Sequence, residues 1–385
     1  MPAVPTPLSR RELPRLPLAL AAALGLTSTL SACSLLPSSS GSESELGSTL
    51  EDADFLEDPL AYEGPSTALP AEVGIRPVAE EPTPSLPVTL TDSQGTEVTI
   101  EDVSRILAID LYGSTSRIVF DLGLGANIVG RDTSSQYAEI QDLPLVTQNG
   151  HELNGESILE LAPTLIITDS SLGPWDVVLQ MRESGIPVVV VDSHRSLDGT
   201  PDLIQQVADA VGLPEEGSVL AERTDREIQE SLARIAEIAP SDEAKKLRMM
   251  FFYARGQSGT YYIFGTGSGA DDLISSIGGI DVAAEIGWDG MKPMTDEAFL
   301  EASPDLLLMM TKGLASMGGI DGMLESLPAI ALTPAGQTRR VVDMADTEIM
   351  SFGPATAAAL EALAVAVYAP ETANTAAAQS GGQAA

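Results

Sequence analysis

The sequence predicts an α/β protein in which two related lobes are joined by one long helix. Apolar, strand-like runs alternate with amphipathic helical patterns along most of the chain, as is typical of α/β architecture. A unit of helix, proline and strand occurs once in each half of this alternating region. Between the halves, one helical pattern continues for long enough to bridge two lobes.

The start of the chain has the pattern of an exported lipoprotein. Three arginines precede an apolar run over 16–30, which is shorter than the roughly 20 residues that a membrane-spanning helix needs. The run ends in Leu-Ser-Ala-Cys33, which resembles a bacterial lipobox. We therefore predict a lipoprotein signal peptide at 1–32, lipidation of Cys33, and anchoring at the extracytoplasmic face of the cell membrane. The alternative is an ordinary signal peptide with an incidental cysteine.

Two segments have the composition of an unfolded chain. Residues 33–87 are rich in Ser, Pro and acids, and 41–82 contain one base, Arg76. Such a segment cannot bury enough apolar surface to offset the entropy lost on ordering, so we predict an acidic disordered tether. The Ala/Gln/Gly-rich end at 371–385 is predicted to be a disordered tail.

Between these segments we predict an N-terminal lobe at 88–201, a linking helical segment at 202–240 and a C-terminal lobe at 241–370. The linking segment contains a helical pattern over 215–238, which would be about 36 Å long. Strands are predicted at 88–90, 98–100, 106–109, 128–130, 164–168 and 188–191 in the first lobe, and at 247–254, 261–264, 306–310 and 340–342 in the second.

The internal repeat relates the two lobes. Glu156 precedes Pro163 by seven positions and leads into one predicted strand, and Glu297 precedes Pro304 by seven positions and leads into another. The repeat predicts two lobes of the same construction, and a chance match is the alternative.

Composition excludes several classes of function. The formal net charge of −36, from 56 acidic and 20 basic residues, would repel phosphate backbones, so no nucleic acid partner is expected. We expect no enzyme either. The glycine clusters at 123–125 and 265–269 lack the Lys-Ser/Thr of a phosphate-binding loop, no Gly-x-Ser-x-Gly elbow occurs, and two histidines are too few for the usual zinc sites.

The lipobox, the acidic tether, the two lobes and the long helix together resemble the binding proteins of iron-complex, cobalamin and haem importers, over about residues 88–370. The resemblance implies a class III periplasmic-binding-protein fold, in which a backbone helix joins two Rossmann-like lobes and the ligand lies between them. It implies an ABC permease and its ATPase as partners, and we expect the binding protein itself to be a monomer. In relatives, one surface Glu on each lobe docks to permease arginines, and the matching residues are Glu156 and Glu297. Alternatively, each Glu only complements a helix dipole.

Within this family the closer resemblance is to the hemin-uptake lipoproteins of the HmuT type. It rests on Gln-Asn-Gly-His at 148–151 and Phe-Tyr-Ala-Arg at 252–255. These relatives bind haem iron through a His from the first lobe and a Tyr from the second, with an Arg two residues after the Tyr. The resemblance implies haem as the transported ligand, His151 and Tyr253 as its metal ligands, and Arg255 beside the tyrosine.

This set of residues suits ferric haem, because imidazole and phenolate are both established axial ligands. A phenol keeps its proton up to about pH 10 unless a positive charge lies nearby. Residues two apart on a strand point to the same side, so Arg255 would supply that charge to Tyr253. Taken alone, His151 would more often be a structural histidine and Tyr253 a packing residue.

Three further residues are candidates for contact with the ligand. Met310 ends a predicted strand, and its flexible side chain suits a porphyrin slot, although core packing explains it equally well. Tyr112 and Trp175 lie in first-lobe loops that follow predicted strands. His194 follows the predicted strand at 188–191 and could also reach the cleft, but we interpret it as a polar loop residue.

The predicted function is therefore that of a lipid-anchored receptor, which binds haem between two lobes and delivers it to an ABC permease. One alternative is a receptor for a ferric siderophore or cobalamin, whose metals arrive already coordinated. The other is a cell-surface haem relay that works without a permease.

Overall fold

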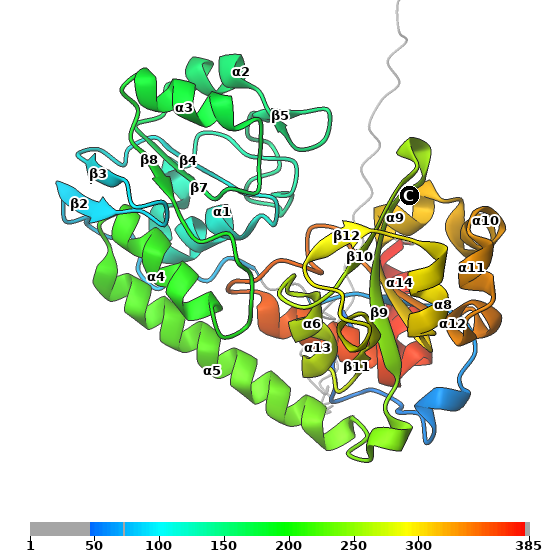
Figure 1. Cartoon of the computed structure of the whole chain (residues 1–385). Coiled ribbons are helices and arrows are strands. Elements are labelled where there is room, and N and C mark those ends of the chain that lie inside the picture. The colour runs from blue at the N-terminus through cyan, green and yellow to red at the C-terminus, as the bar shows by residue number, and fades with distance from the viewer. Residues whose placement is uncertain (1–46, 72–73, 382–385) are drawn as a thin grey trace, which may run out of the picture. The chain divides into compact units, whose positions relative to one another are not determined.

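The computed structural model describes residues 47–71 and 74–381 (Figure 1). The predicted signal peptide at 1–32 and the predicted lipidation of Cys33 fall outside the described residues. In the part of the chain that is described, no helix combines the length and the apolar character that crossing a membrane requires.

The first lobe is a small α/β unit. Its elements are β2 (Val88–Thr91), β3 (Glu97–Ile100), β4 (Ile106–Ile109), α1 (Ser114–Val119), η2 (Phe120–Leu124), η3 (Gly125–Asn127), β5 (Thr147–Gln148), β6 (Glu152–Leu153), α2 (Gly155–Glu160), β7 (Leu165–Thr168), α3 (Trp175–Glu183), β8 (Val188–Val190) and α4 (Thr200–Ala210). β4, β7 and β8 form a parallel sheet in that order, and all their residues are buried, as is typical of parallel sheets covered on both faces. The strand predicted at 128–130 is only a single bridge between Ile128 and Ile106.

The second lobe is built on a mixed sheet. Its elements are η4 (Glu243–Lys245), β9 (Arg248–Arg255), η5 (Gly256–Ser258), β10 (Thr260–Phe264), α6 (Ala270–Ser276), β11 (Ile280–Asp281), α7 (Val282–Glu285), β12 (Met291–Pro293), α8 (Asp296–Ala302), β13 (Leu306–Met310), α9 (Thr311–Ser316), α10 (Gly319–Ser326), α11 (Pro328–Ala331), α12 (Pro334–Thr338), β14 (Val341–Met344) and α13 (Thr356–Tyr368). β9, β13 and β14 run parallel. β10 folds back antiparallel against β9 and pairs Tyr262 with Tyr253.

The long helix α5 (Pro214–Ile238) joins the lobes, as the sequence predicts. It begins with Pro214 and has Glu215 and Glu216 in its first turn, and both features favour a helix N-terminus. It packs against α4 of the first lobe and α13 of the second. At a rise of about 1.5 Å per residue, its length of roughly 37 Å is sufficient to carry both. The protein therefore has two α/β lobes on one backbone helix.

The repeated unit of helix, proline and strand is present in both lobes. α2 leads through Pro163 to β7, and α8 leads through Pro304 to β13. The residue before each proline has the same left-handed backbone conformation, with φ of 45° at Ala162 and 46° at Ser303. Non-glycine residues rarely adopt this conformation, so its recurrence at equivalent positions supports a common construction of the two lobes.

The prediction of a disordered tether over 33–87 is wrong for the described residues. β1 (Ser66–Ala68) lies parallel to β14 at the edge of the second-lobe sheet. Before it, η1 (Pro59–Ala61) leads to Tyr62, whose ring lies 4.6 Å from the guanidinium of the buried Arg340. Composition does not predict these contacts, because a short run of small residues is enough to add an edge strand to a sheet that the rest of the chain forms.

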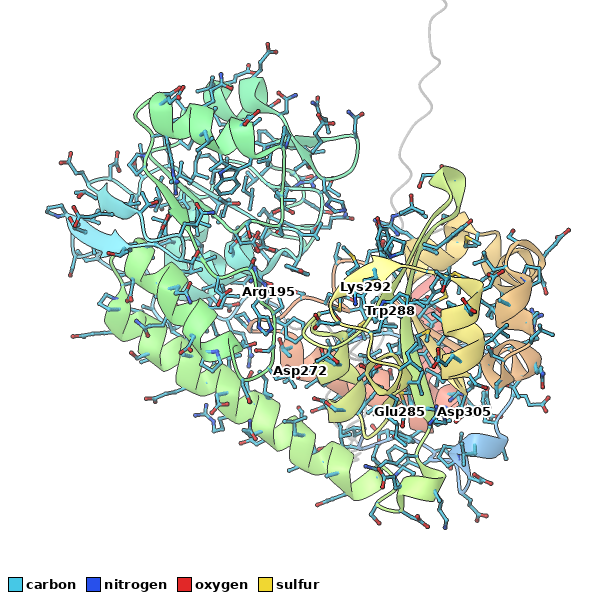
Figure 2. All side chains as sticks on the ribbon, in the orientation of Figure 1. Arg195, Asp272, Glu285, Trp288, Lys292 and Asp305 are labelled. Atoms are coloured by element: carbon cyan, nitrogen blue, oxygen red, sulfur yellow. The ribbon has the colours of Figure 1, made fainter. Side chains whose placement is uncertain are left out.

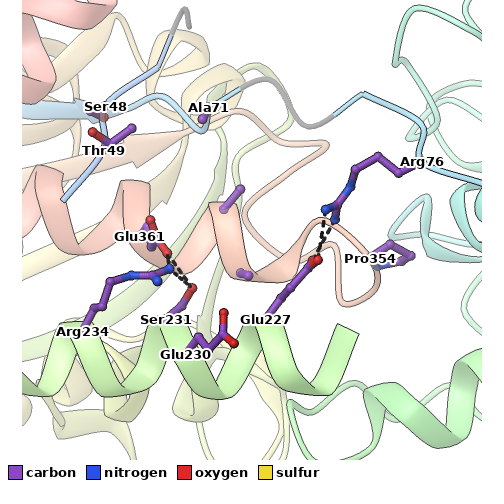
Figure 3. A pocket seen from close by; sticks show the side chains of 12 residues that line it. Ser48, Thr49, Ala71, Arg76, Glu227, Glu230, Ser231, Arg234, Pro354 and Glu361 are labelled. Atoms are coloured by element: carbon purple, nitrogen blue, oxygen red, sulfur yellow. Dashed lines mark hydrogen bonds and ion pairs between the residues drawn. The ribbon is translucent and has the colours of Figure 1, made fainter. Parts of the chain in front are cut away.

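After β1, the same segment is held against α5. Arg76 donates two hydrogen bonds, of 3.0 and 2.7 Å, to the carboxylate of Glu227 on α5 (Figure 3). Further along α5, Arg234 pairs with Glu361 of α13 (Figure 3). The N-terminal segment, the backbone helix and α13 are therefore linked by side-chain contacts in one region.

The prediction of a disordered tail at 371–385 is also wrong for the described residues. Most of this segment belongs to α14 (Pro370–Gly381), which packs against β1 and α13. Ala373 is fully buried, and the Asn374 amide donates to the Pro65 carbonyl over 3.0 Å. The alanine-rich composition that suggested disorder also has a high helix propensity, and packing decides between the two.

Candidate functional site

A cavity of about 890 Å³ is lined by both lobes, and its size lies within the usual range for small-molecule sites. The first lobe contributes loops that follow β4, β5 and β8, and the second lobe contributes β9, β10 and the end of β13. The residues that line the cavity include Tyr112, Gln136, His151, His194, Arg195, Tyr253, Arg255, Tyr262, Phe264, Met310, Lys312 and Asp346.

His151 lies in the hairpin between β5 and β6. The preceding Asn149 and Gly150 have positive φ values of 47° and 95°, which are typical of residues in tight turns. The imidazole is half-buried on the cavity wall, and its buried Nδ1 has no hydrogen-bond partner among the described residues. Burial, and then the positive charge of Arg255, lower the pKa of His151, so the ring is neutral at pH 7, as a metal ligand must be.

Tyr253 and Arg255 lie two residues apart at the end of β9, and both line the cavity. The Arg255 guanidinium lies 4.6 Å from the centre of the Tyr253 ring, which is a cation–π distance. Asp346 accepts a hydrogen bond of 3.0 Å from Arg255 and so holds the guanidinium in place. The second lobe thus presents a phenol with a fixed positive charge beside it.

The same wall carries three aromatic rings, those of Tyr253, Tyr262 and Phe264. The Tyr253 ring lies 6.0 Å from that of Phe264 at an angle of 22°, and 6.3 Å from that of Tyr262 at 63°. Met310 is half-buried at the end of β13, where it both packs against the core and lines the cavity. Flat rings and a flexible thioether form a surface suited to a flat, apolar ligand.

Tyr112 belongs to a second tyrosine–arginine pair, on the first-lobe wall. Arg195, labelled in Figure 2, lies 4.8 Å from the centre of the Tyr112 ring. Arg195 is buried and donates to Asp169 over 2.6 Å, so its charge is balanced locally. Burial raises the pKa of Tyr112 in spite of Arg195, so this hydroxyl keeps its proton. Tyr112 is therefore suited to stacking or hydrogen bonding.

Trp175 is not among the cavity-lining residues described. It is the first residue of α3, and it packs against the apolar cluster that includes Ile109, Ile166 and Val178. This packing gives no support to the prediction that Trp175 contacts the ligand, because an aromatic residue at the start of a helix can turn inward to its own lobe. His194, interpreted above as a polar loop residue, is exposed and lines the cavity.

Glu156 and Glu297 occupy equivalent surface positions. Both are exposed, and each is the second residue of its helix, after the N-caps Asn154 and Thr295. A carboxylate at this position also complements the helix dipole, so position alone does not assign a role to either residue.

Three basic side chains line the cavity of this strongly acidic protein. Among the described residues, its wall contains Arg195, Arg255 and Lys312 but a single carboxylate, Asp346. The Lys312 ammonium donates to the Gln136 amide oxygen over 3.4 Å, and no ion pair to it is found in the described ranges. Arg195 is paired with Asp169 and Arg255 with Asp346, so within the described ranges Lys312 is the basic group of the wall that stays available to a negatively charged group of a ligand.

Buried carboxylates support the first-lobe wall. Asp110 accepts hydrogen bonds from the backbone N–H groups of Tyr112 and Thr115, at 2.6 and 2.7 Å, and so shapes the loop that carries Tyr112. Burial, and then the charge of Asp110, raise the pKa of Asp132 to about 7 and that of Asp169 to about 6. Arg195 limits the second of these shifts.

These carboxyl groups predict greater stability at about pH 5 than at about pH 8. The unperturbed carboxyl pKa is 3.8, so between about pH 4 and pH 7 the folded state binds more protons than the unfolded state. The free energy of unfolding therefore falls as the pH rises through this window. We expect calorimetry to give a Tm several degrees higher at the lower pH, and Asp132→Asn to reduce the difference. A Tm that rises with pH would contradict this prediction.

Comparison with known proteins identifies the family. A sequence model of the periplasmic binding protein family matches residues 109–347. A curated relative, the uncharacterized ABC transporter substrate-binding lipoprotein YvrC of Bacillus subtilis (strain 168), is 25% identical over 298 residues, which cover 76% of this chain and 89% of the relative. The chain therefore belongs to the periplasmic binding protein family, which confirms the fold and the family predicted from the sequence.

Solved structures agree with this assignment. A crystal structure of heme binding protein HmuT is 44% identical with a TM-score of 0.76, and covers 81% of this chain and 99% of that one. The periplasmic heme-binding protein RhuT from Roseiflexus sp. RS-1, in its apo form, is 34% identical with a TM-score of 0.62. The match covers 70% of this chain and 99% of RhuT. Three further HmuT structures carry single replacements by alanine, of a histidine, of a tyrosine, and of an arginine two positions after that tyrosine.

Proposed function

We propose that this protein is the haem receptor of an ABC importer, held at the extracytoplasmic face of the cell membrane by a lipid on Cys33. Haem occupies the cavity, its iron binds His151 and Tyr253, and a permease with its ATPase takes the haem up. One observation carries the proposal: a neutral imidazole with an unpartnered buried nitrogen and a phenol beside a guanidinium line the same cavity from different lobes.

The chemistry of the two ligands supports ferric haem as the cargo. A phenol that binds ferric iron gives up its proton, and the Arg255 guanidinium, 4.6 Å from the ring, stabilises the negative charge that results. The hydrogen bond from Arg255 to Asp346 keeps that guanidinium oriented. His151 needs no deprotonation step at pH 7, because burial and Arg255 already favour its neutral form.

The rest of the cavity supports haem over the alternative cargoes. Haem is flat and carries two propionate carboxylates, which suit the aromatic rings of the second-lobe wall and the ammonium of Lys312. Cobalamin and ferric siderophores bring their metal already coordinated, and would leave the unpartnered imidazole of His151 without a role. The haem-binding relatives, in which a His, a Tyr and a nearby Arg were chosen for replacement, add support of a separate kind.

A hemin titration of the apo-protein tests the proposal. We expect a saturable, red-shifted Soret band, and no comparable binding of cobalamin or a ferric siderophore, because the free axial ligands are what recognises the cargo. Saturable binding of cobalamin without any change in the hemin spectrum would replace haem with the alternative cargo.

A further inference from the structure

The helices α2 and α8 present the same exposed side chains at equivalent positions of the two lobes. In α2 these are Glu156, Leu159 and Glu160, and in α8 they are Glu297, Leu300 and Glu301. Positions three and four apart lie on one face of a helix, so each lobe shows a leucine flanked by two carboxylates. The residue before each leucine, Ile158 or Phe299, points inward and is fully buried.

The exposure of these leucines is not explained by the fold. Leu159 is 39% exposed and Leu300 is 48% exposed, in helices whose inner faces already fill the cores of their lobes. A single exposed leucine is ordinary on a protein surface. Here two of them recur at matching positions of a repeated unit, each between the same acidic neighbours.

We infer that Leu159 and Leu300 are contact residues for the importer permease, in addition to the glutamates beside them. The inference rests on the proposed function and extends its docking surface. Because the two lobes offer the same pattern, the partner is expected to have two equivalent sites, each with an apolar socket bordered by basic side chains. A membrane complex of two like halves, with arginine or lysine around each socket, meets this requirement.

The two lobes also provide matched controls for a test. Leu179 of α3 in the first lobe is 42% exposed, and Leu332 of the second lobe is 65% exposed, but neither belongs to the repeated pattern. Alanine at any of the four positions removes an exposed side chain and leaves the buried cores intact, so all four variants should fold and bind hemin as the wild-type protein does.

The measurement is the affinity of each haem-loaded variant for its permease–ATPase complex in lipid nanodiscs. Burial of a leucine at an interface predicts that Leu159→Ala and Leu300→Ala each weaken binding roughly tenfold, and that Leu179→Ala and Leu332→Ala change it less than twofold. If the first two variants bind like the controls while Glu156→Lys binds poorly, docking depends on charge alone and the inference is overturned. If wild-type protein binds hemin but not the complex, delivery to the permease and this inference both fail.

Discussion

Replacing Tyr253 with phenylalanine is expected to weaken hemin binding by about 100-fold, the upper end of what is lost when even an indirect contact to a metal is removed. The phenyl ring keeps its packing against Phe264 but has no oxygen for the iron. His151→Ala should have a similar effect, with a different residual spectrum because the phenolate remains. Absorbance titration with hemin measures both losses.

The cavity offers close controls for this prediction. Tyr112→Phe and His194→Ala change the same residue types in the same cavity, and both should keep the Soret band of the wild-type complex. The hemin affinity of Arg255→Gln should lie between those of the ligand variants and the control variants, because this change removes the charge beside the phenol and leaves the phenol itself. Normal hemin spectra in both ligand variants would remove His151 and Tyr253 from the site.

Reversing the charge at both Glu156 and Glu297 is expected to abolish haem uptake while leaving hemin affinity unchanged. Both carboxylates are exposed on helices that do not line the cavity, so lysine there repels a basic permease surface without touching the ligand. Uptake is measured as growth on haem as the iron source in cells that carry only the variant, and hemin affinity is measured on purified protein.

Glu215→Lys is the matched control, because Glu215 is also an exposed acid in the first turn of a helix. It makes the same change to a helix dipole, which costs about 0.3–1 kcal/mol, at a position outside the repeat. Normal uptake by the doubly substituted protein would favour the relay that needs no permease. If Glu215→Lys loses as much haem uptake as the double variant, the acids at these helix termini matter only for stability.

The fold was predictable where local pattern and tertiary structure agree. β4 and β7 are continuous apolar runs because both faces of their sheet are covered, and α5 repeats its apolar residues at helical spacing along its whole length. β1 was missed because nothing in Ser-Thr-Ala marks a strand. Its pairing of Ser66 with Val342 joins segments far apart in the sequence, and composition carries no information on such a contact.

The site was predictable only in part, for a similar reason. Tyr253 and Arg255 share one strand, and His151 follows a turn that can be identified in the sequence, so local spacing relates these residues to the cavity. Arg195, Lys312 and Asp346 reach it from separate loops, and only the folded chain brings them together. The sequence places His194 in the loop after a strand, but local pattern does not tell which way that loop turns.

The contacts of residues 66–68 and Arg76 with the folded body limit the distance that a lipid anchor at Cys33 would allow between the protein and a membrane. A fully extended tether from residue 33 to residue 87 would reach about 190 Å, at roughly 3.5 Å per residue. Because the described fold begins at residue 47, a lipid on Cys33 would leave a connecting segment that spans at most about 50 Å. With the proposed lipid at Cys33, so short a segment would confine the protein to a thin layer above the bilayer, where its effective concentration at a permease would be much higher than free diffusion would allow.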